Sequence, residues 1–199
     1  MLQPTHQAPE FKAQAVVNGQ FKDLSLADYR GKNVILLFYP LDFTFVCPTE
    51  ILAFSDRIEE FRARNTEVLG ISTDSAFSHL AWTNTRREEG GIKDLAYPLV
   101  ADFTKAISRA YGVLMEEAGL AYRGLFLIDK AGTIQHITIN NLPLGRSVEE
   151  ALRMVDALTH FEQHGEVCPA DWRPGKRAMV ADVEKSKAYF QEAAAVGAR

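Results

Sequence analysis

Cysteine is scarce in this chain, which has only Cys47 and Cys168 among its 199 residues. Two cysteines are too few for a small protein held together by disulfides, and no Cys-x-x-Cys pair is present to form a zinc ribbon. The length instead allows one domain that is large enough to bury a core of its own. Each cysteine must therefore be judged by the residues around it.

Long hydrophobic runs and blocks of positive charge are also lacking. The longest apolar run covers residues 34–41, far short of the roughly 20 residues that span a bilayer. The first residues have neither a basic start nor an apolar stretch, so we expect no secretory signal, no membrane contact and a cytoplasmic location. The formal net charge is −4 and no run of five basic residues occurs, which predicts no nucleic-acid partner.

Runs of apolar residues predict the strands of a sheet. Continuous runs of this kind are typical of strands that are buried on both faces. We expect strands over residues 34–39, 66–72, 99–100, 125–128 and 133–139. Residues 129–132 predict a turn, so the last two strands should form an antiparallel hairpin within a mixed sheet.

Apolar residues at helical spacing predict helices between these strands. Ile51, Phe54, Ile58 and Phe61 recur in this way along one segment. We expect helices over residues 47–64, 75–85, 104–111, 148–158 and 182–194, the fourth of them with Ser147 as its cap. The alternation predicts an α/β fold in which helices flank a central mixed sheet.

The C-terminal segment differs from the rest of the chain. Glycine and proline interrupt regular structure at Gly165, Pro169, Pro174 and Gly175. Such a segment seldom packs as a domain alone and more often lies on another surface. We therefore predict one domain over residues 1–164 and an extended C-terminal arm over residues 165–199.

The surroundings of Cys47 favour a reactive thiol. Pro48 is tolerated only near a helix start, so the helix should begin at Cys47 or within a residue or two of it. The sulfur would then lie beside free backbone N–H groups and the positive end of the helix dipole. Lowering the pKa of a thiol from about 8.5 to about 6 takes ~3.4 kcal/mol, whereas a helix end supplies at most about 2 kcal/mol. A nearby cation must provide the remainder, and arginine is favoured because its guanidinium can also hold oxygen atoms.

A hydroxyl and a second thiol could take part in the same chemistry. Thr44 precedes Cys47 by three residues, and its hydroxyl can both accept and donate a hydrogen bond. Cys168 lies in a flexible segment, where a mobile thiol could form a disulfide with an oxidised Cys47. Two alternatives remain open at this point, namely that Cys47 is a buried cysteine that packs as a small hydrophobe and that Cys168 is an incidental exposed one.

Several segments resemble the typical two-cysteine peroxiredoxins. The P-x-x-x-T-x-x-C core is present as Pro40, Thr44 and Cys47, and the H-G-E-V-C-P-A signature as residues 164–170. Residues 121–129 and 141–147 also match, and the resemblance covers nearly the whole chain. It implies a thioredoxin-like fold and a thiol peroxidase that needs no metal or other cofactor.

The resemblance also implies roles for individual residues. Cys47 would be the peroxidatic cysteine and Cys168 the resolving one. Arg123 would be the cation beside Cys47, Thr44 would hydrogen-bond the thiolate and the peroxide, and Pro40 would shield the pocket.

Two further residues would support the site. Glu50 and Arg146 would orient Arg123 or pair with one another. For Arg146, a surface salt bridge is the alternative.

The implied reaction cycle uses both cysteines. The Cys47 thiolate attacks hydrogen peroxide or an alkyl hydroperoxide and becomes a sulfenic acid. The first helical turn then unwinds, Cys168 of a partner subunit condenses with the sulfenic acid, and thioredoxin or a similar dithiol protein reduces the disulfide. The family forms dimers and often rings of five dimers. Phe77 and Trp82 would lie between dimers, unless they pack in the core.

One departure from the family's pattern concerns overoxidation of the reactive cysteine. Sensitive members carry a G-G-[LI]-G loop and a Tyr-Phe pair in the C-terminal helix. Tyr189 and Phe190 are present here, but Lys93 replaces the last glycine of the loop. This combination predicts intermediate sensitivity.

Three other functions are compatible with parts of the sequence. A thiol–disulfide oxidoreductase shares the fold but normally uses Cys-x-x-Cys, whereas position 50 is Glu50. A ring-forming holdase chaperone is the alternative function, and it should survive a Cys47→Ser substitution that abolishes peroxidase turnover. A metal site at His160, His164 and Cys168 is disfavoured, because glycine and proline interrupt a common helical face.

Overall fold

The structure is a computed structural model that describes residues 2–197. It divides into two compact units, residues 1–148 and residues 149–199. Helix α5 (Val148–His164) falls almost entirely in the second unit. The division after residue 164, expected from composition, stays a prediction about domains. Within residues 2–197, the helices are all too short or too polar to span a bilayer.

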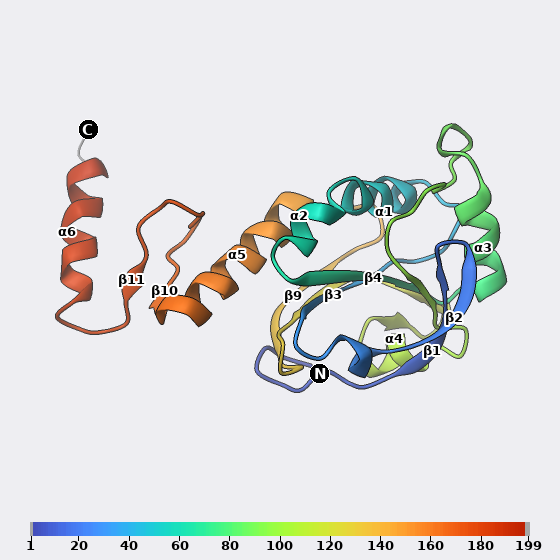
Figure 1. Cartoon of the computed structure of the whole chain (residues 1–199), viewed down its shortest axis with the longest axis horizontal. Helices are drawn as coiled ribbons and strands as arrows, with labels where there is room; N and C mark the ends of the chain where they lie inside the picture. Colours follow the sequence, from blue (N-terminus) through green and yellow to red (C-terminus); the bar gives the residue numbers. More distant parts are fainter. Residues whose placement is uncertain (1, 198–199) are drawn as a thin grey trace. The chain divides into compact units, whose positions relative to one another are not determined.

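The first unit is built on a seven-stranded mixed sheet with the order β2-β1-β5-β4-β3-β8-β9 (Figure 1). Its strands are β1 (Lys12–Val17), β2 (Gln20–Ser25), β3 (Asn33–Phe38), β4 (Thr66–Ser72), β5 (Leu99–Ala101), β8 (Arg123–Ile128) and β9 (Ile134–Asn140). Strand β3 pairs in parallel with β4 and antiparallel with β8, and β8 forms the predicted hairpin with β9. A mixed sheet is therefore confirmed.

The hairpin of β1 and β2 was not predicted from the sequence. Most of its residues are exposed or only half-buried, so it has no continuous apolar run. The signal that could have found it is the Asn18-Gly19 pair, because both residues have positive φ angles, 50° and 71°. Such a pair is the usual two-residue turn of a hairpin. A second, smaller hairpin consists of β6 (Leu114–Met115) and β7 (Leu120–Ala121).

Four α-helices lie between the strands of the first unit. They are α1 (Val46–Asp56), α2 (Ile58–Arg62), α3 (Ala76–Asn84) and α4 (Ala106–Ala110), with two 3₁₀ helices, η1 (Leu26–Tyr29) and η2 (Arg87–Glu89). The prediction of one continuous helix over residues 47–64 is wrong, because Arg57 leaves the helical conformation at φ −113° and ψ 18°. Helix α3 starts as predicted, with the Ser75 hydroxyl accepting from the backbone N–H of Ser78.

The central strand β3 is buried on both faces, as its apolar run predicts. Leu36 and Phe38 belong to a core cluster that also contains Ile107 of α4. Ile35 and Leu37 point to the opposite face, by the two-residue period of a strand, and are fully buried as well. Figure 1 shows α1 and α2 on one side of the sheet and α4 on the other. The sheet is therefore a layer between helices, and α1 begins just beyond one of its central strands.

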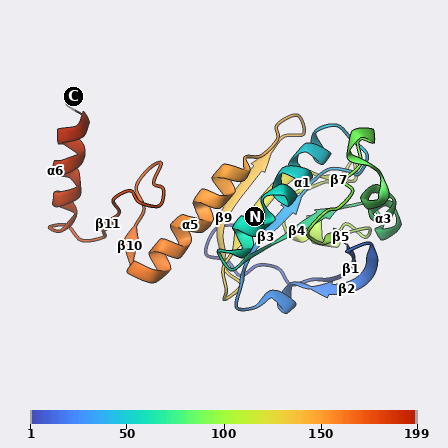
Figure 2. The ribbon, with the colours of Figure 1, turned by 45° about the horizontal axis from the view of Figure 1, so that its top comes forward.

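The second unit contains long α5, a short hairpin and a C-terminal helix (Figure 2). The hairpin consists of β10 (Glu166–Val167) and β11 (Met179–Val180), and the last helix is α6 (Ser186–Gly197). Trp172 is buried in this unit, and its ring lies 4.7 Å from that of His160. Residues that follow α5 therefore pack against α5 within the second unit.

Candidate active site

The loop between β3 and α1, together with the first turn of α1, carries three of the residues singled out in the sequence, Pro40, Thr44 and Cys47. Strand β3 ends at Phe38 and α1 begins at Val46. Pro40 and Cys47 are both buried, and Cys47 has no exposed surface. The prediction that a helix begins within a residue or two of Cys47 is confirmed. No side chain caps this helix start, so N–H groups of its first turn are available to other acceptors.

Arg123 supplies the cation that the sequence argument called for. It is the first residue of β8, the antiparallel neighbour of β3. Its Nη1 donates to the Cys47 sulfur at 3.3 Å, and its side chain is only 4% exposed. Its Nε donates to the carbonyl oxygen of Leu142 at 2.6 Å, which fixes the plane of the guanidinium. Two residues 76 positions apart in the chain are thereby brought together.

Glu50 lies between two arginines, one turn along α1 from Cys47. Its Oε2 pairs with Arg123 Nη1 at 2.6 Å. Its Oε1 accepts from the backbone N–H and from Nε of Arg146, both at 2.7 Å. Two guanidinium groups therefore share one carboxylate, and one positive charge remains in excess beside the sulfur of Cys47.

These partners determine the ionisation of Glu50. Burial by itself raises the pKa of the Glu50 carboxyl. The hydrogen bonds and charge of Arg146, together with the charge of Arg123, outweigh burial and hold this pKa below its usual value. Glu50 is therefore a carboxylate at neutral pH and can keep both guanidinium groups in place.

Arg146 is a buried residue that joins three elements. Its Nη1 donates to the carbonyl oxygens of Phe38 at 2.7 Å and Gly124 at 2.6 Å, at the end of β3 and in β8. Its side chain is 2% exposed. The alternative of a surface salt bridge is therefore wrong for Arg146. The two carbonyl partners could not be found from sequence, because backbone acceptors have no residue signature.

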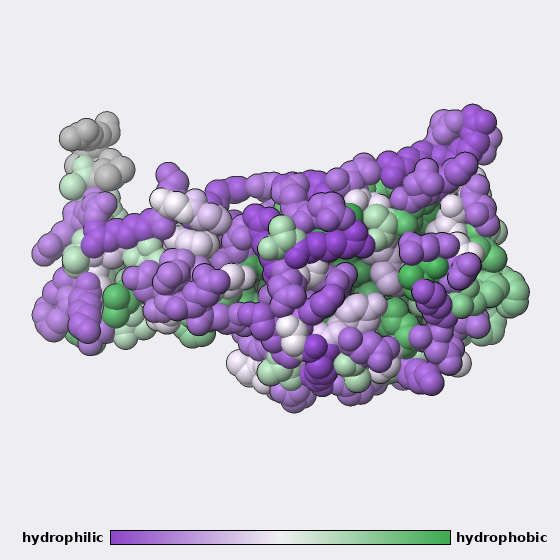
Figure 3. Space-filling model, in the orientation of Figure 1, coloured by the Kyte–Doolittle hydropathy of each residue, from purple (hydrophilic) through white to green (hydrophobic). Residues whose placement is uncertain are grey.

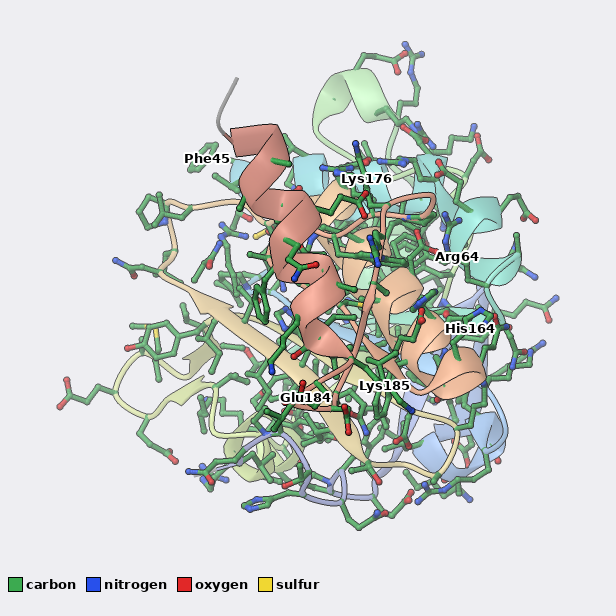
Figure 4. The ribbon with its side chains drawn as sticks, turned by 90° about the vertical axis from the view of Figure 1, so that its left-hand side faces the viewer. Phe45, Arg64, His164, Lys176, Glu184 and Lys185 are labelled. Atoms are coloured by element: carbon green, nitrogen blue, oxygen red, sulfur yellow. The ribbon has the colours of Figure 1, made fainter. Side chains whose placement is uncertain are left out.

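Thr44 lies on the more open side of the loop. It is half-buried, and its hydroxyl donates to the carbonyl oxygen of Leu41 at 3.0 Å. The proton of this hydroxyl is thereby directed at the backbone, and the lone pairs of its oxygen are left to accept. The neighbouring Phe45 is 91% exposed, and Figure 4 shows its ring pointing away from the body of the molecule.

Cys168 has different surroundings within the second unit. It is half-buried, and its sulfur lies 3.6 Å from the carbonyl oxygen of Ala157 on α5. Burial raises the pKa of the Cys168 thiol, the charge of Arg153 lowers it and the charge of Glu166 raises it, so that the pKa lies above its usual value. Cys168 is therefore a neutral thiol at neutral pH.

The histidines near Cys168 have partners of their own in the second unit. His160 Nε2 donates a hydrogen bond to Glu166 Oε2 at 3.0 Å. Its ring also lies 4.6 Å from that of His164, which Figure 4 labels at the end of α5. These contacts give both rings partners within the second unit.

The two aromatic residues of α3 have different surroundings. Trp82 is fully buried, and its indole N–H donates to the carbonyl oxygen of Gly90 at 2.9 Å. Of the two roles considered for Trp82, a contact between dimers or packing in the core, the structure shows packing in the core. Phe77 is 73% exposed and its ring contacts Phe21 at 5.1 Å. Figure 3 shows hydrophobic surface over β2 and α3.

Sequence reasoning missed a buried polar group beneath the loop. Tyr39, Asp42 and His79 are buried and joined by hydrogen bonds. A second missed contact is the Tyr97 hydroxyl, which donates to the carbonyl oxygen of Ile51 in α1 at 2.9 Å. For the buried group around Asp42, the one indication in the sequence was the position of this acidic residue between Pro40 and Thr44.

Comparison with known proteins places this geometry in a family. Residues 4–137 match the AhpC/TSA family, and residues 157–192 match the C-terminal domain of 1-Cys peroxiredoxin. Peroxiredoxin-2 of Mus musculus is 59% identical over 93% of each chain. The reduced 2-Cys peroxiredoxin of Plasmodium vivax is 45% identical, with a TM-score of 0.92 over 94% of this chain and 98% of that one. Thioredoxin peroxidase I of Plasmodium yoelii is 50% identical, with a TM-score of 0.77 over 87% and 100%.

The fold and these relatives define the class: a thiol peroxidase with the thioredoxin-like fold. The chain belongs to the AhpC/TSA family of peroxiredoxins. The predicted fold and the predicted peroxidase activity are thereby confirmed.

Proposed function

We propose that Cys47 is the cysteine of this peroxidase that reacts with hydrogen peroxide and alkyl hydroperoxides. The observation that carries the proposal is the 3.3 Å contact between Arg123 Nη1 and the buried Cys47 sulfur. Arg123 and Arg146 share the single negative charge of Glu50, so the three side chains have a net charge of +1. This charge and the start of α1 stabilise a thiolate at Cys47.

The first step breaks the O–O bond of the peroxide. The Cys47 thiolate attacks the terminal oxygen, an S–O bond forms, and the remaining oxygen leaves with the bonding electrons as water or an alcohol after it takes up a proton. Arg123 stabilises the charge that develops on the leaving oxygen. The Thr44 oxygen accepts from the O–H of the substrate, since its own proton is directed at Leu41. Pro40 shields the pocket from water.

The second step joins the two cysteines. The sulfenic acid on Cys47 would be enclosed, since the residue has no exposed surface. The first turn of α1 must therefore open before the Cys168 thiol of a partner subunit attacks, which forms a disulfide and releases water. A dithiol protein such as thioredoxin then reduces this bond by exchange. The name of the Plasmodium yoelii relative, a thioredoxin peroxidase, supports this choice of reductant.

The assembly that we propose is a homodimer that forms a ring of five dimers. The exposed rings of Phe77 and Phe21 are suited to a contact between dimers. Trp82 supports this surface from within the core. A cytoplasmic location agrees with two cysteines that must return to the reduced state in each cycle.

A non-reducing gel after peroxide treatment tests the cysteine assignments. We expect wild-type protein to shift to a covalent dimer, and peptide mass spectrometry to identify a Cys47–Cys168 link. Cys168→Ser should stop at the sulfenic acid, and Cys47→Ser should consume no peroxide. Peroxide consumption by Cys47→Ser at the wild-type rate would overturn the proposal.

The loop after η2 bears on overoxidation. Gly90 has a φ of 79°, and a side chain at Gly91 would collide with the carbonyl of Thr85, so both glycines are required by the backbone. Lys93 follows without such a constraint. Intermediate sensitivity stays a prediction, and mass spectrometry of sulfinic acid formed during turnover at increasing peroxide is the measurement. Inactivation at the lowest peroxide concentrations would contradict it.

A further inference from the structure

A buried hydrogen-bond network lies beneath the loop that carries Pro40 and Thr44. Its centre is Asp42, which is 6% exposed, and His79, which has no exposed surface. None of the steps proposed above uses either residue. A carboxylate and an imidazole buried together are costly to desolvate unless their hydrogen bonds are satisfied.

Both oxygens of the Asp42 carboxylate accept hydrogen bonds. The Tyr39 hydroxyl donates to Oδ1 at 2.8 Å, and the Ser78 hydroxyl donates to Oδ2 at 2.8 Å. His79 Nδ1 also lies 2.8 Å from Oδ2. The backbone N–H of Asp42 donates to Asp74 Oδ2 at 3.0 Å. Tyr39 directly follows β3, Ser78 and His79 belong to α3, and Asp74 follows β4, so one loop residue is attached to three fixed elements.

The hydrogen-bond partners of His79 determine where its protons lie. Its Nε2 is 3.2 Å from the carbonyl oxygen of Val100, which can only accept. The Nε2 atom therefore carries a proton. Because Nδ1 faces the Oδ2 of Asp42, a further proton must lie between these two atoms, or two lone pairs would meet. His79 and Asp42 thus hold one proton that belongs to the pair.

Two other ionisable groups, Tyr39 and Asp74, lie beside Asp42 and have raised pKa values. Burial and the charge of Asp42 raise the pKa of the Tyr39 hydroxyl well above its usual value, so Tyr39 remains a donor. Burial and the charge of Asp42 likewise raise the pKa of Asp74, against the hydrogen bond from Ser72. The network therefore contains Tyr39, Asp42, Asp74 and His79 as its titratable members.

The backbone of the loop shows why it needs such an attachment. Phe43 has a φ of 53°, a left-handed conformation that is unfavourable for a residue with a bulky side chain. Its ring packs against Trp82 with centroids 6.0 Å apart. The strained residue lies between Asp42, which the network holds, and Thr44. Without the network, the chain from Pro40 to Thr44 would relax to another conformation.

We propose that His79 is a positioning residue for the peroxidase reaction, which acts through the proton that it shares with Asp42 to hold Pro40 and Thr44 at the Cys47 pocket. The proposal rests on the proposed function of Cys47, because the loop matters only if peroxide reacts there. His79 acts on the geometry of the pocket and not on the charge of the sulfur, which Arg123 and the helix start determine.

Two substitutions at one position separate this role from a general contribution to folding. His79→Leu fills the space but removes the donor to Asp42, whereas His79→Asn places an amide N–H near the position of Nδ1. In a Cys168→Ser background, two second-order rate constants are measured on Cys47 by rapid quenching and mass spectrometry, one with hydrogen peroxide and one with iodoacetamide. Thermal unfolding and circular dichroism identify the temperature range in which both variants are folded.

We expect His79→Leu to lower the peroxide rate constant by about 100-fold, the effect of a small displacement of substrate-positioning groups. Its iodoacetamide rate constant should change by less than about threefold, since the thiolate is retained. His79→Asn should recover most of the peroxide rate. Equal losses in both rate constants, an unchanged peroxide rate in folded His79→Leu, or no recovery in folded His79→Asn would each overturn the proposal. If instead wild-type Cys47 fails to react with peroxide, the proposed function of Cys47 itself fails.

Discussion

The two cysteines of this chain have opposite surroundings. Cys47 is completely buried at the start of a helix, with a guanidinium at 3.3 Å. Cys168 is half-buried in the second unit, and its surroundings raise the pKa of its thiol. A buried sulfur can be the more reactive of the two, because fixed charge and hydrogen-bond donors matter more for a thiolate than exposure to water does. The half-buried Cys168 is the thiol that we propose moves towards a partner subunit.

Removing the cation beside Cys47 should have the largest effect. In Arg123→Gln, Glu50 and Arg146 remain as a neutral pair, and the leaving oxygen loses the positively charged donor beside it. We expect the peroxide rate constant to fall by about 10²–10³-fold, measured by rapid quenching. Arg123→Lys keeps the positive charge but loses the planar guanidinium. Its peroxide rate constant should lie between those of wild type and Arg123→Gln. Arg109→Gln is the matched control, because Arg109 pairs with exposed Glu116 at the surface. A loss in the control as large as in Arg123→Gln would show that the effect is not specific to the site.

Glu50→Gln should test what holds the two arginines together. The side chain keeps its shape, but two buried guanidinium groups then lack a counter-charge. Breaking a buried ion pair in this way should cost about 3 kcal/mol in the free energy of unfolding, measured by urea denaturation at neutral pH. Peroxidase activity should also fall, because Arg123 loses its main anchor. Unchanged stability would mean that the pair is replaced by water or by other acceptors.

The pH dependence of stability gives Glu50 a second, smaller signature. Its pKa is lower in the folded protein than the usual 4.5. The unfolded chain therefore takes up this proton first, and the stabilisation from Glu50 is fully present above about pH 4.5 and is lost as the pH falls through the folded-state value. The difference in stability between wild type and Glu50→Gln should shrink in this acidic range. A difference that stays constant between pH 6 and pH 3 would contradict the lowered pKa.

Changes around Cys168 should have the smallest effects. In a Cys47→Ser background, Glu166→Gln removes a charge that raises the pKa of the Cys168 thiol, and Arg153→Gln removes one that lowers it. We expect iodoacetamide alkylation of Cys168 at pH 7 to become about twofold faster in the first variant and about twofold slower in the second, because these charges are screened by solvent. Equal rates in both variants would mean that burial alone determines the reactivity of this thiol.

The sequence predicted the parts of the fold that have strong local patterns. The run of residues 34–39 is strand β3, and Pro48 correctly indicated the start of α1. The break at Arg57 and the mostly exposed β1–β2 hairpin were missed, because neither has an apolar pattern of its own.

The candidate site was predictable only in its residue types. The need for an arginine followed from an energy argument, and the choice of Arg123 followed from a resemblance. The carbonyl of Leu142, the two carbonyls that hold Arg146 and the proton shared by Asp42 and His79 depend on the folded backbone. No linear pattern encodes such contacts, because the atoms that meet belong to distant residues and to main-chain groups.

The pH dependence of Cys47 alkylation tests directly whether Arg123 and the start of α1 keep this sulfur as a thiolate at neutral pH. The Cys168→Ser protein is treated with iodoacetamide from pH 5 to pH 9, and the modified Cys47 is measured by mass spectrometry. We expect a rate constant at pH 6 within about threefold of that at pH 8, because the sulfur is already a thiolate. A rate constant that rises about tenfold per pH unit over this range, as for a free thiol in water, would contradict it.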